Sequence, residues 1–129
     1  MSQNSKSVTV GWFEIPVSDM DRAIQFYNEV FDMKISKQDF AGAEMAFFPW
    51  SENDKGAGGS LIHADEHYTP NHQGTLVYFS STDVNTELKK VPGAGGKIIQ
   101  KKTEISPDIG YMALFEDSEG NRLALHSRS

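Results

Sequence analysis

The chain has 129 residues, a length typical of one domain, and it contains no cysteine. Disulfides, thiolate zinc sites, iron–sulfur clusters and a cysteine nucleophile are therefore excluded. Twelve basic and eighteen acidic residues give a net charge of −6, which disfavours nucleic acid and anionic membranes as partners and favours a small-molecule ligand. No stretch approaches the roughly 18 apolar residues of a membrane span. Because residues 1–7 also lack the apolar core of a signal peptide, we expect a soluble cytoplasmic protein.

The first half of the chain predicts one strand, one helix and three further strands. Residues 11–17 alternate in character and are rich in β-forming side chains, which predicts a strand. Ser18 to Asp21 then supplies short oxygen side chains that typically begin a helix. One apolar stripe follows at helical spacing, formed by Met20, Ile24, Tyr27 and Phe31. Short strands are expected near 33–38, 43–49 and 59–63.

The second half predicts the same order of elements. After a polar connection from Ala64 to Gln73, a strand is expected at 74–80 and a weaker helix at 83–91, ended by Pro92 and Gly93. The remaining strands are expected near 97–102, 110–116 and 121–127. Asp117 to Asn121 is predicted to form the turn of the last hairpin.

The two halves also correspond residue by residue. A shift of 64 places residues 12–20 on 76–84 with the same pattern of apolar and polar positions. We therefore interpret the chain as a tandem duplication within one domain, residues 1–129, with βαβββ modules at 8–64 and 74–127. The predicted fold class is α+β.

Two segments carry a resemblance to a known family. Glu14 to Tyr27, which opens the first module, and Phe115 to Leu125, which closes the second, are similar to the vicinal oxygen chelate superfamily. That superfamily includes glyoxalase I, bleomycin-resistance proteins and extradiol dioxygenases. The resemblance implies that the mixed sheets curl into a cup, and that the protein is a homodimer binding a small molecule.

Members of the superfamily that use a metal hold it with His, Gln or Glu at four positions in the cup. By resemblance these positions are Trp12, Ile62, Leu76 and Ala124 here. None of these side chains offers an imidazole nitrogen or a carboxylate oxygen. We therefore expect no metal ligands and no cofactor, with an unplaced divalent metal as the alternative.

Strand alternation and the resemblance indicate which residues face the cup. Trp12 and Glu14 share one face of the first strand, and Leu76 and Tyr78 occupy the equivalent places in the second module. A carboxylate at Glu14 is expected to be desolvated, which would suit a general base or a hydrogen-bond anchor for ligand. The alternative is a wet or lysine-paired carboxylate at the rim. His126, two residues beyond Ala124, is the second candidate catalytic residue, unless it is a structural histidine.

Aromatic and apolar residues on or near these strands are the candidate ligand-binding residues, namely Trp12, Phe47, Trp50, Leu76, Tyr78, Tyr111 and Met112. The preferred hypothesis is metal-independent binding or sequestration of a planar, partly apolar molecule. One alternative is an isomerase or lyase of the glyoxalase type, acting on a small carbonyl compound with Glu14 as base or with a divalent metal. A pure interaction module, with the cup filled by its own side chains, is a third possibility. The remaining histidines, His63, His67 and His72, lack the regular spacing of a ligand set.

Overall fold

The computed structural model describes residues 7–129 and confirms the expected pair of βαβββ modules. Residues 1–6, which make up most of the stretch expected not to be a signal peptide, lie outside the described residues. The first module contains β1 (Trp12–Pro16), α1 (Met20–Phe31), β2 (Gln38–Phe40), β3 (Ala43–Phe47) and β4 (Gly58–His63). The second contains β5 (Tyr78–Ser80), α2 (Val84–Leu88), β6 (Lys97–Ser106), β7 (Gly110–Glu116) and β8 (Arg122–Ser127).

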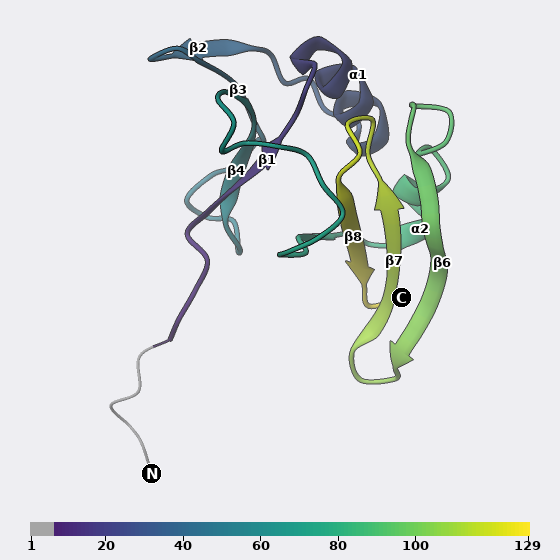
Figure 1. Ribbon diagram of the computed structural model, residues 1–129. Coiled ribbons are helices and arrows are strands. Elements are labelled where there is room, and N and C mark those ends of the chain that lie inside the picture. The colour runs from purple at the N-terminus through teal and green to yellow at the C-terminus, as the bar shows by residue number, and fades with distance from the viewer. Residues whose placement is uncertain (1–6) are drawn as a thin grey trace.

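Each module forms one mixed sheet of four strands. The strand orders are β1-β4-β3-β2 and β5-β8-β7-β6, so the last strand of each module lies between its first and third strands. The first and last strands pair in parallel, and the other pairs are antiparallel. Figure 1 shows the two sheets side by side, with α1 close to the turn between β7 and β8.

Helix α1 begins where the sequence predicts. Asp19 is its N-cap residue, and its carboxylate accepts a hydrogen bond from the Arg22 amide at 3.1 Å. The helix ends at Asp32, whose φ of 52° is left-handed. Its buried residues are Met20, Ala23, Phe26, Tyr27 and Val30, a face rotated from the predicted stripe. The rotation follows from contacts with both modules, because Tyr27 packs against Phe48 of the first module and Phe26 against Phe115 of the second.

Three elements begin or end at least three residues inside their predicted bounds. Helix α2 ends at Leu88 rather than at 91, because Pro92 has no amide hydrogen and its ring crowds the carbonyl four residues earlier. Strand β5 begins at Tyr78 rather than at 74, after a turn in which Gly74 has a φ of 90°. Strand β2 begins only at Gln38, five residues later than expected.

One hydrophobic core joins the modules. The ring centroids of Phe31 and Phe79 lie 4.8 Å apart, and those of Phe13 and Phe79 lie 5.9 Å apart. Phe26 of α1 stacks on Phe115 of β7 at 6.3 Å. These contacts cross from one module to the other, so the chain folds as one domain.

The hairpin turn predicted at 117–121 does more than reverse the chain. The carboxylate of Glu119 accepts hydrogen bonds from the amides of Ser18 and Asp19 at 2.9 and 2.8 Å, and it pairs with the Arg22 guanidinium at 2.7 Å. Arg22 and the amide of Asp19 hold the pKa of Glu119 below its usual value, although burial acts in the opposite direction. We call the contacts between this turn and the start of α1 the module clasp.

A buried pair completes the clasp. The hydroxyl of Tyr27, which is fully buried, donates to the carboxylate of Asp117 at 2.7 Å. Asn121 donates to the same carboxylate at 3.0 Å and to the carbonyl of Pro16 at 2.7 Å. Burial raises the pKa of both Tyr27 and Asp117, and for Asp117 it outweighs the hydrogen bonds from Asn121 and Tyr27. A polar network therefore fixes one module against the other.

No helix among residues 7–129 is long and apolar enough to cross a membrane.

Candidate functional site

The strand register defines an open face on each sheet, turned away from the helices. In β1, Ile15 is buried in the core, whereas Trp12 and Glu14 point to the opposite face and are exposed. Their neighbours on β4, Gly58 and Ser60, share that face. In the second module Tyr78, Ala124 and His126 occupy the corresponding face, as the sequence predicts.

A hollow of about 650 Å³ lies between the two modules on this side. Of the predicted ligand-binding residues, Trp12, Trp50, Leu76 and Tyr78 line it. Trp12, Trp50 and Tyr78 are each about half exposed, at 47%, 50% and 49%. We call this space the aromatic hollow, because exposed rings form much of its wall.

Gly58 allows the two tryptophans to lie close together. A Cβ atom at Gly58 would stand 3.2 Å from Cγ of Trp50 and 3.4 Å from Cζ3 of Trp12. The indole nitrogen of Trp50 donates to the carbonyl of Gly56 at 3.2 Å, which orients the ring. The ring of Phe47 lies 5.9 Å from that of Trp12 and extends the aromatic surface along β3. Phe47 is thus placed beside the hollow rather than in its wall.

A smaller cleft of about 180 Å³ adjoins the aromatic hollow, since Thr75 and Val77 line both. We call it the polar cleft, because Glu14, Gln73 and Arg122 also line it. Glu14 is exposed, and its only hydrogen bond within the described chain is a long one of 3.4 Å from the Trp12 indole. The expected desolvation of Glu14 is therefore not found, because the side chain is exposed at a solvent-accessible cleft.

The other predicted site residues lie apart from the two spaces. His126 is on the open face, but its Nε2 is hydrogen-bonded to the carbonyl of Ile109 at 2.7 Å. Met112 lies opposite His126 in the β7–β8 register and lines neither space. Tyr111 is on the other face of β7, with the core residue Ala113, and the Lys102 ammonium sits over its ring at 4.7 Å. Tyr111 therefore lies on a strand that borders the open face, but its ring points to the opposite side of the sheet.

The register also corrects one of the four positions compared with metal ligands. The Val17 amide donates to the carbonyl of Ile62 at 2.8 Å, and the Ser81 amide donates to that of His126 at the same distance. Donor and acceptor of the second pair each lie 64 positions after those of the first. Ile62 therefore corresponds to His126, and Ser60 corresponds to Ala124. Ile62 lies 62 rather than 64 positions before Ala124, so the two residues are not equivalent.

The corrected set does not fit a divalent metal. Trp12, Ser60, Leu76 and Ala124 offer an indole, a hydroxyl and two aliphatic chains, none of which is an imidazole or a carboxylate. The histidines outside the cup have separate partners: His63 the carbonyl of Val17, His67 the carboxylate of Asp65, and His72 the carboxylate of Glu116. Within residues 7–129, no three His, Cys, Asp or Glu side chains are grouped as a metal site would require.

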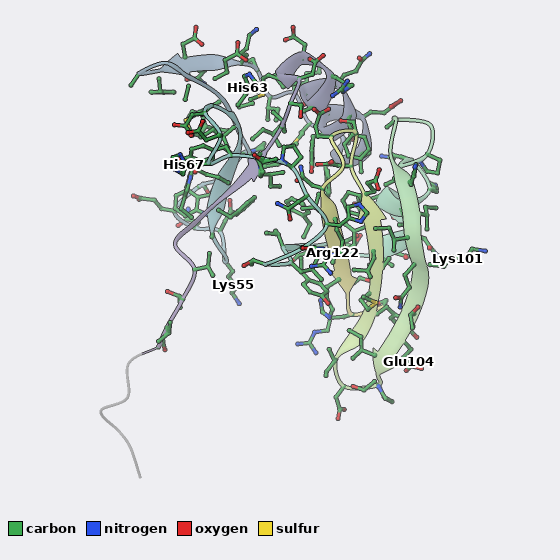
Figure 2. All side chains as sticks on the ribbon, viewed as in Figure 1. Lys55, His63, His67, Lys101, Glu104 and Arg122 are labelled. Carbon is green, nitrogen blue, oxygen red and sulfur yellow. The ribbon has the colours of Figure 1, made fainter. Side chains whose placement is uncertain are left out.

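Sequence reasoning missed two contributors to the site. Arg122 is two residues before Ala124, so alternation alone would have placed it on the open face. Figure 2 shows it on the side of the second sheet nearer the first module, whereas Lys101 projects from the outer edge. Gln73 belongs to the segment interpreted as a solvated connection, and no local pattern indicates that this segment folds back as a wall of the cleft.

Comparisons with known proteins agree with this geometry. The model of the Glyoxalase/Bleomycin resistance protein/Dioxygenase superfamily matches residues 9–125. A solved domain of the same description from a Frankia species has 18% sequence identity and a TM-score of 0.71, covering 95% of this chain and 98% of that one. An antibiotic-binding protein from a Streptomyces species has 25% identity and a TM-score of 0.66, with coverage of 98% and 100%.

Glyoxalase I from Zea mays is also similar, with 22% identity and a TM-score of 0.69. The match covers 95% of this chain but only 48% of the maize protein, so the chain spans about half the length of that enzyme. A comparison with curated proteins finds no match.

Proposed function

Because the chain belongs to the Glyoxalase/Bleomycin resistance protein/Dioxygenase superfamily, we propose that it binds and sequesters a small, partly apolar molecule in the aromatic hollow, without a metal. The observation that carries this proposal is the half-exposure of Trp12, Trp50 and Tyr78 around one space between the modules. Removing the apolar surface of an aromatic ring from water is favourable. A surface of three half-exposed rings therefore favours a ligand that covers them.

The shape of the hollow favours a flat ligand. Two indoles packed over Gly58 offer planar apolar surfaces, and offset stacking on such rings contributes about 0.5–1.5 kcal/mol beyond simple burial. The similarity to an antibiotic-binding protein from Streptomyces is consistent with a binding role for this fold.

The test uses dansylamide, an uncharged planar fluorophore that accepts energy from excited tryptophan. We expect saturable energy transfer on titration of the wild-type protein. Trp12→Ala and Trp50→Ala should each weaken binding about tenfold, since a loss of about 1.4 kcal/mol changes an affinity tenfold. Tyr68→Ala is the matched control, because Tyr68 is an exposed aromatic that does not line the hollow. Wild-type protein that gives no saturable transfer would refute the proposal.

A catalytic role is the second candidate. It is favoured by the position of Glu14, whose carboxylate lines a cleft that adjoins the hollow and is free of any ion pair within the described chain. In that case the protein is an isomerase or lyase acting on a small carbonyl compound, with Glu14 as base. Methylglyoxal and glutathione form a hemithioacetal without a catalyst, so the assay separates its isomers by chromatography before mass spectrometry, with and without added Zn²⁺ or Ni²⁺. Catalysis converts the hemithioacetal into an isomeric thioester and Glu14→Gln abolishes that product, whereas sequestration leaves only the hemithioacetal and its two components.

We further propose that the protein is a homodimer in the cytoplasm. Apolar side chains such as Phe40 and Ile109 remain about half exposed and are available to a second copy. Sedimentation equilibrium measures the mass in solution, and a monomer at micromolar concentration would contradict the dimer.

A further inference from the structure

The polar cleft contains a guanidinium without a carboxylate partner. Arg122 stands opposite Glu116 in the β7–β8 register, but that carboxylate binds the His72 ring at 2.7 Å instead. Within residues 7–129, no carboxylate oxygen lies within 4.0 Å of the Arg122 nitrogens. Its Nη2 donates to the carbonyl of Gly74 at 3.0 Å.

The Nε atom of Arg122 is more unusual. It is buried and has no hydrogen-bond partner in the described chain. A buried N–H group without an acceptor costs free energy, so each such group calls for an explanation in terms of a molecule that satisfies it. Because this N–H group is buried, a ligand in the cleft reaches the guanidinium through its terminal nitrogens, which can donate two parallel hydrogen bonds to a planar carboxylate.

A carboxylate of opposite charge lines the same cleft. Glu14 has no cation within 4.0 Å in the described chain, and its contact with the Trp12 indole is long at 3.4 Å. Glu14 and Arg122 therefore face one space without neutralising each other. A ligand carrying one positive and one negative group would satisfy both, whereas a ligand of single charge would leave one of them unpaired.

The remaining polar side chains narrow the choice. Asn121 is committed to the carbonyl of Pro16 and to Asp117, and Asn71 donates to the carbonyl of Thr69. These asparagines act as walls, so Glu14 and Arg122 supply the charges that recognise a ligand, and Gln73 adds a neutral polar side chain. The volume of about 180 Å³ suits a compact head group rather than a whole planar molecule.

The cleft and the aromatic hollow lie side by side, since Thr75 and Val77 line both. Building on the proposed function, we propose that the ligand is an aromatic zwitterion of the amino-acid type. Its carboxylate pairs with Arg122, its ammonium group with Glu14, and its ring lies in the aromatic hollow against the tryptophans. The charged cleft thus selects the ligand, and the hollow supplies the apolar contact.

The experiment compares four molecules that share one ring and differ in charge: free phenylalanine, phenethylamine, 3-phenylpropanoate and 3-phenylpropanamide. Each is titrated directly by calorimetry at pH 7 and also as a competitor of bound dansylamide. We expect phenylalanine to bind at least tenfold more tightly than any of the other three, because only it pairs with both charges.

Two variants test the assignment of each charge. Arg122→Gln should lower the affinity for phenylalanine about tenfold, to that of phenethylamine, and Glu14→Gln should lower it to that of 3-phenylpropanoate. Arg128→Gln and Glu104→Gln are matched controls, because both residues are exposed and line neither space. Unchanged binding of dansylamide in Arg128→Gln and Glu104→Gln shows that removing a charge outside the cleft leaves the hollow intact, and near-native urea midpoints show that Arg122→Gln and Glu14→Gln are folded.

The outcomes separate this proposal from the one on which it rests. If dansylamide binds but phenylalanine binds no more tightly than 3-phenylpropanamide, water satisfies Arg122 and the zwitterion proposal is wrong, while the binding function stands. The same conclusion follows if Arg122→Gln leaves the affinity for phenylalanine unchanged. If neither dansylamide nor phenylalanine binds in either assay, both proposals are overturned.

Discussion

Replacing Glu119 with glutamine tests how strongly the module clasp holds the domain together. Glutamine has nearly the same shape, so the substitution leaves packing in place and removes the charge. One of the Glu119 oxygens accepts from the amides of Ser18 and Asp19, and the other accepts from Arg22 Nε at 2.7 Å. In Glu119→Gln an –NH₂ group replaces one carboxylate oxygen. This group can only donate hydrogen bonds, and it points at other donors, either the Arg22 guanidinium or the amides of Ser18 and Asp19.

The expected loss can be worked out from these contacts. Hydrogen bonds to a charged group contribute about 1.5–3 kcal/mol and neutral ones about 0.5–1.5, so neutralising the acceptor of two backbone amides costs about 2 kcal/mol. The ion pair with Arg22 adds at most about 1 kcal/mol, because the arginine side chain is 53% exposed. We therefore expect Glu119→Gln to lower the free energy of unfolding by about 2–3 kcal/mol.

Urea denaturation followed by tryptophan fluorescence measures this loss. With a slope of about 1.5 kcal/mol per molar urea, the midpoint should fall by about 1–2 M. Glu104→Gln is the matched control, since Glu104 is exposed on the edge strand β6 and makes no side-chain hydrogen bond within residues 7–129. The reasoning is refuted if Glu119→Gln moves the midpoint no more than Glu104→Gln does.

Three further outcomes are expected. Tyr27→Phe should lower the free energy of unfolding by about 1–3 kcal/mol in urea melts, because it leaves the buried carboxylate of Asp117 without one of its donors, and an unchanged midpoint would contradict this. The pKa of Glu119 is lower in the folded protein than its unfolded value of about 4.5, so the stabilisation by this carboxylate is present above that value and is lost as pH falls through the folded pKa. Acid should therefore lower the free energy of unfolding of the wild type more than that of Glu119→Gln. Parallel curves of stability against pH for the two proteins would contradict this prediction. Gly58→Ala should separate the two indoles, shift the tryptophan emission and weaken dansylamide binding several-fold with a near-native urea midpoint, whereas unaltered emission would show that the indoles do not pack over Gly58.

The order of elements and the family could be predicted from the sequence because local patterns determine them. The N-cap at Asp19, the alternation along β1 and the repeat at a shift of 64 depend on residues close in the chain or on a direct comparison of its halves. The same alternation correctly placed Trp12, Leu76 and Tyr78 around one space. Applied to Tyr111, the same alternation places its ring on the face of β7 that carries Ala113, away from the open face.

Pairing across the sheets and between the modules was decided only by the tertiary structure. Ser60 rather than Ile62 corresponds to Ala124 because hydrogen-bond register, and not sequence identity, determines which residues of two strands are equivalent. Glu119 is predicted to be part of an ordinary turn, yet it binds the amides of Ser18 and Asp19, about 100 residues earlier, just before α1 begins.

The polar cleft depends in the same way on long-range packing. Glu14 and Arg122 lie 108 positions apart in the chain, and nothing near either residue in the sequence indicates that they line one space. The sequence determined which faces carry aromatic and charged side chains, because period and composition are local properties. Only the folded chain decided which of these faces meet, because that depends on how the two modules pack around their shared core.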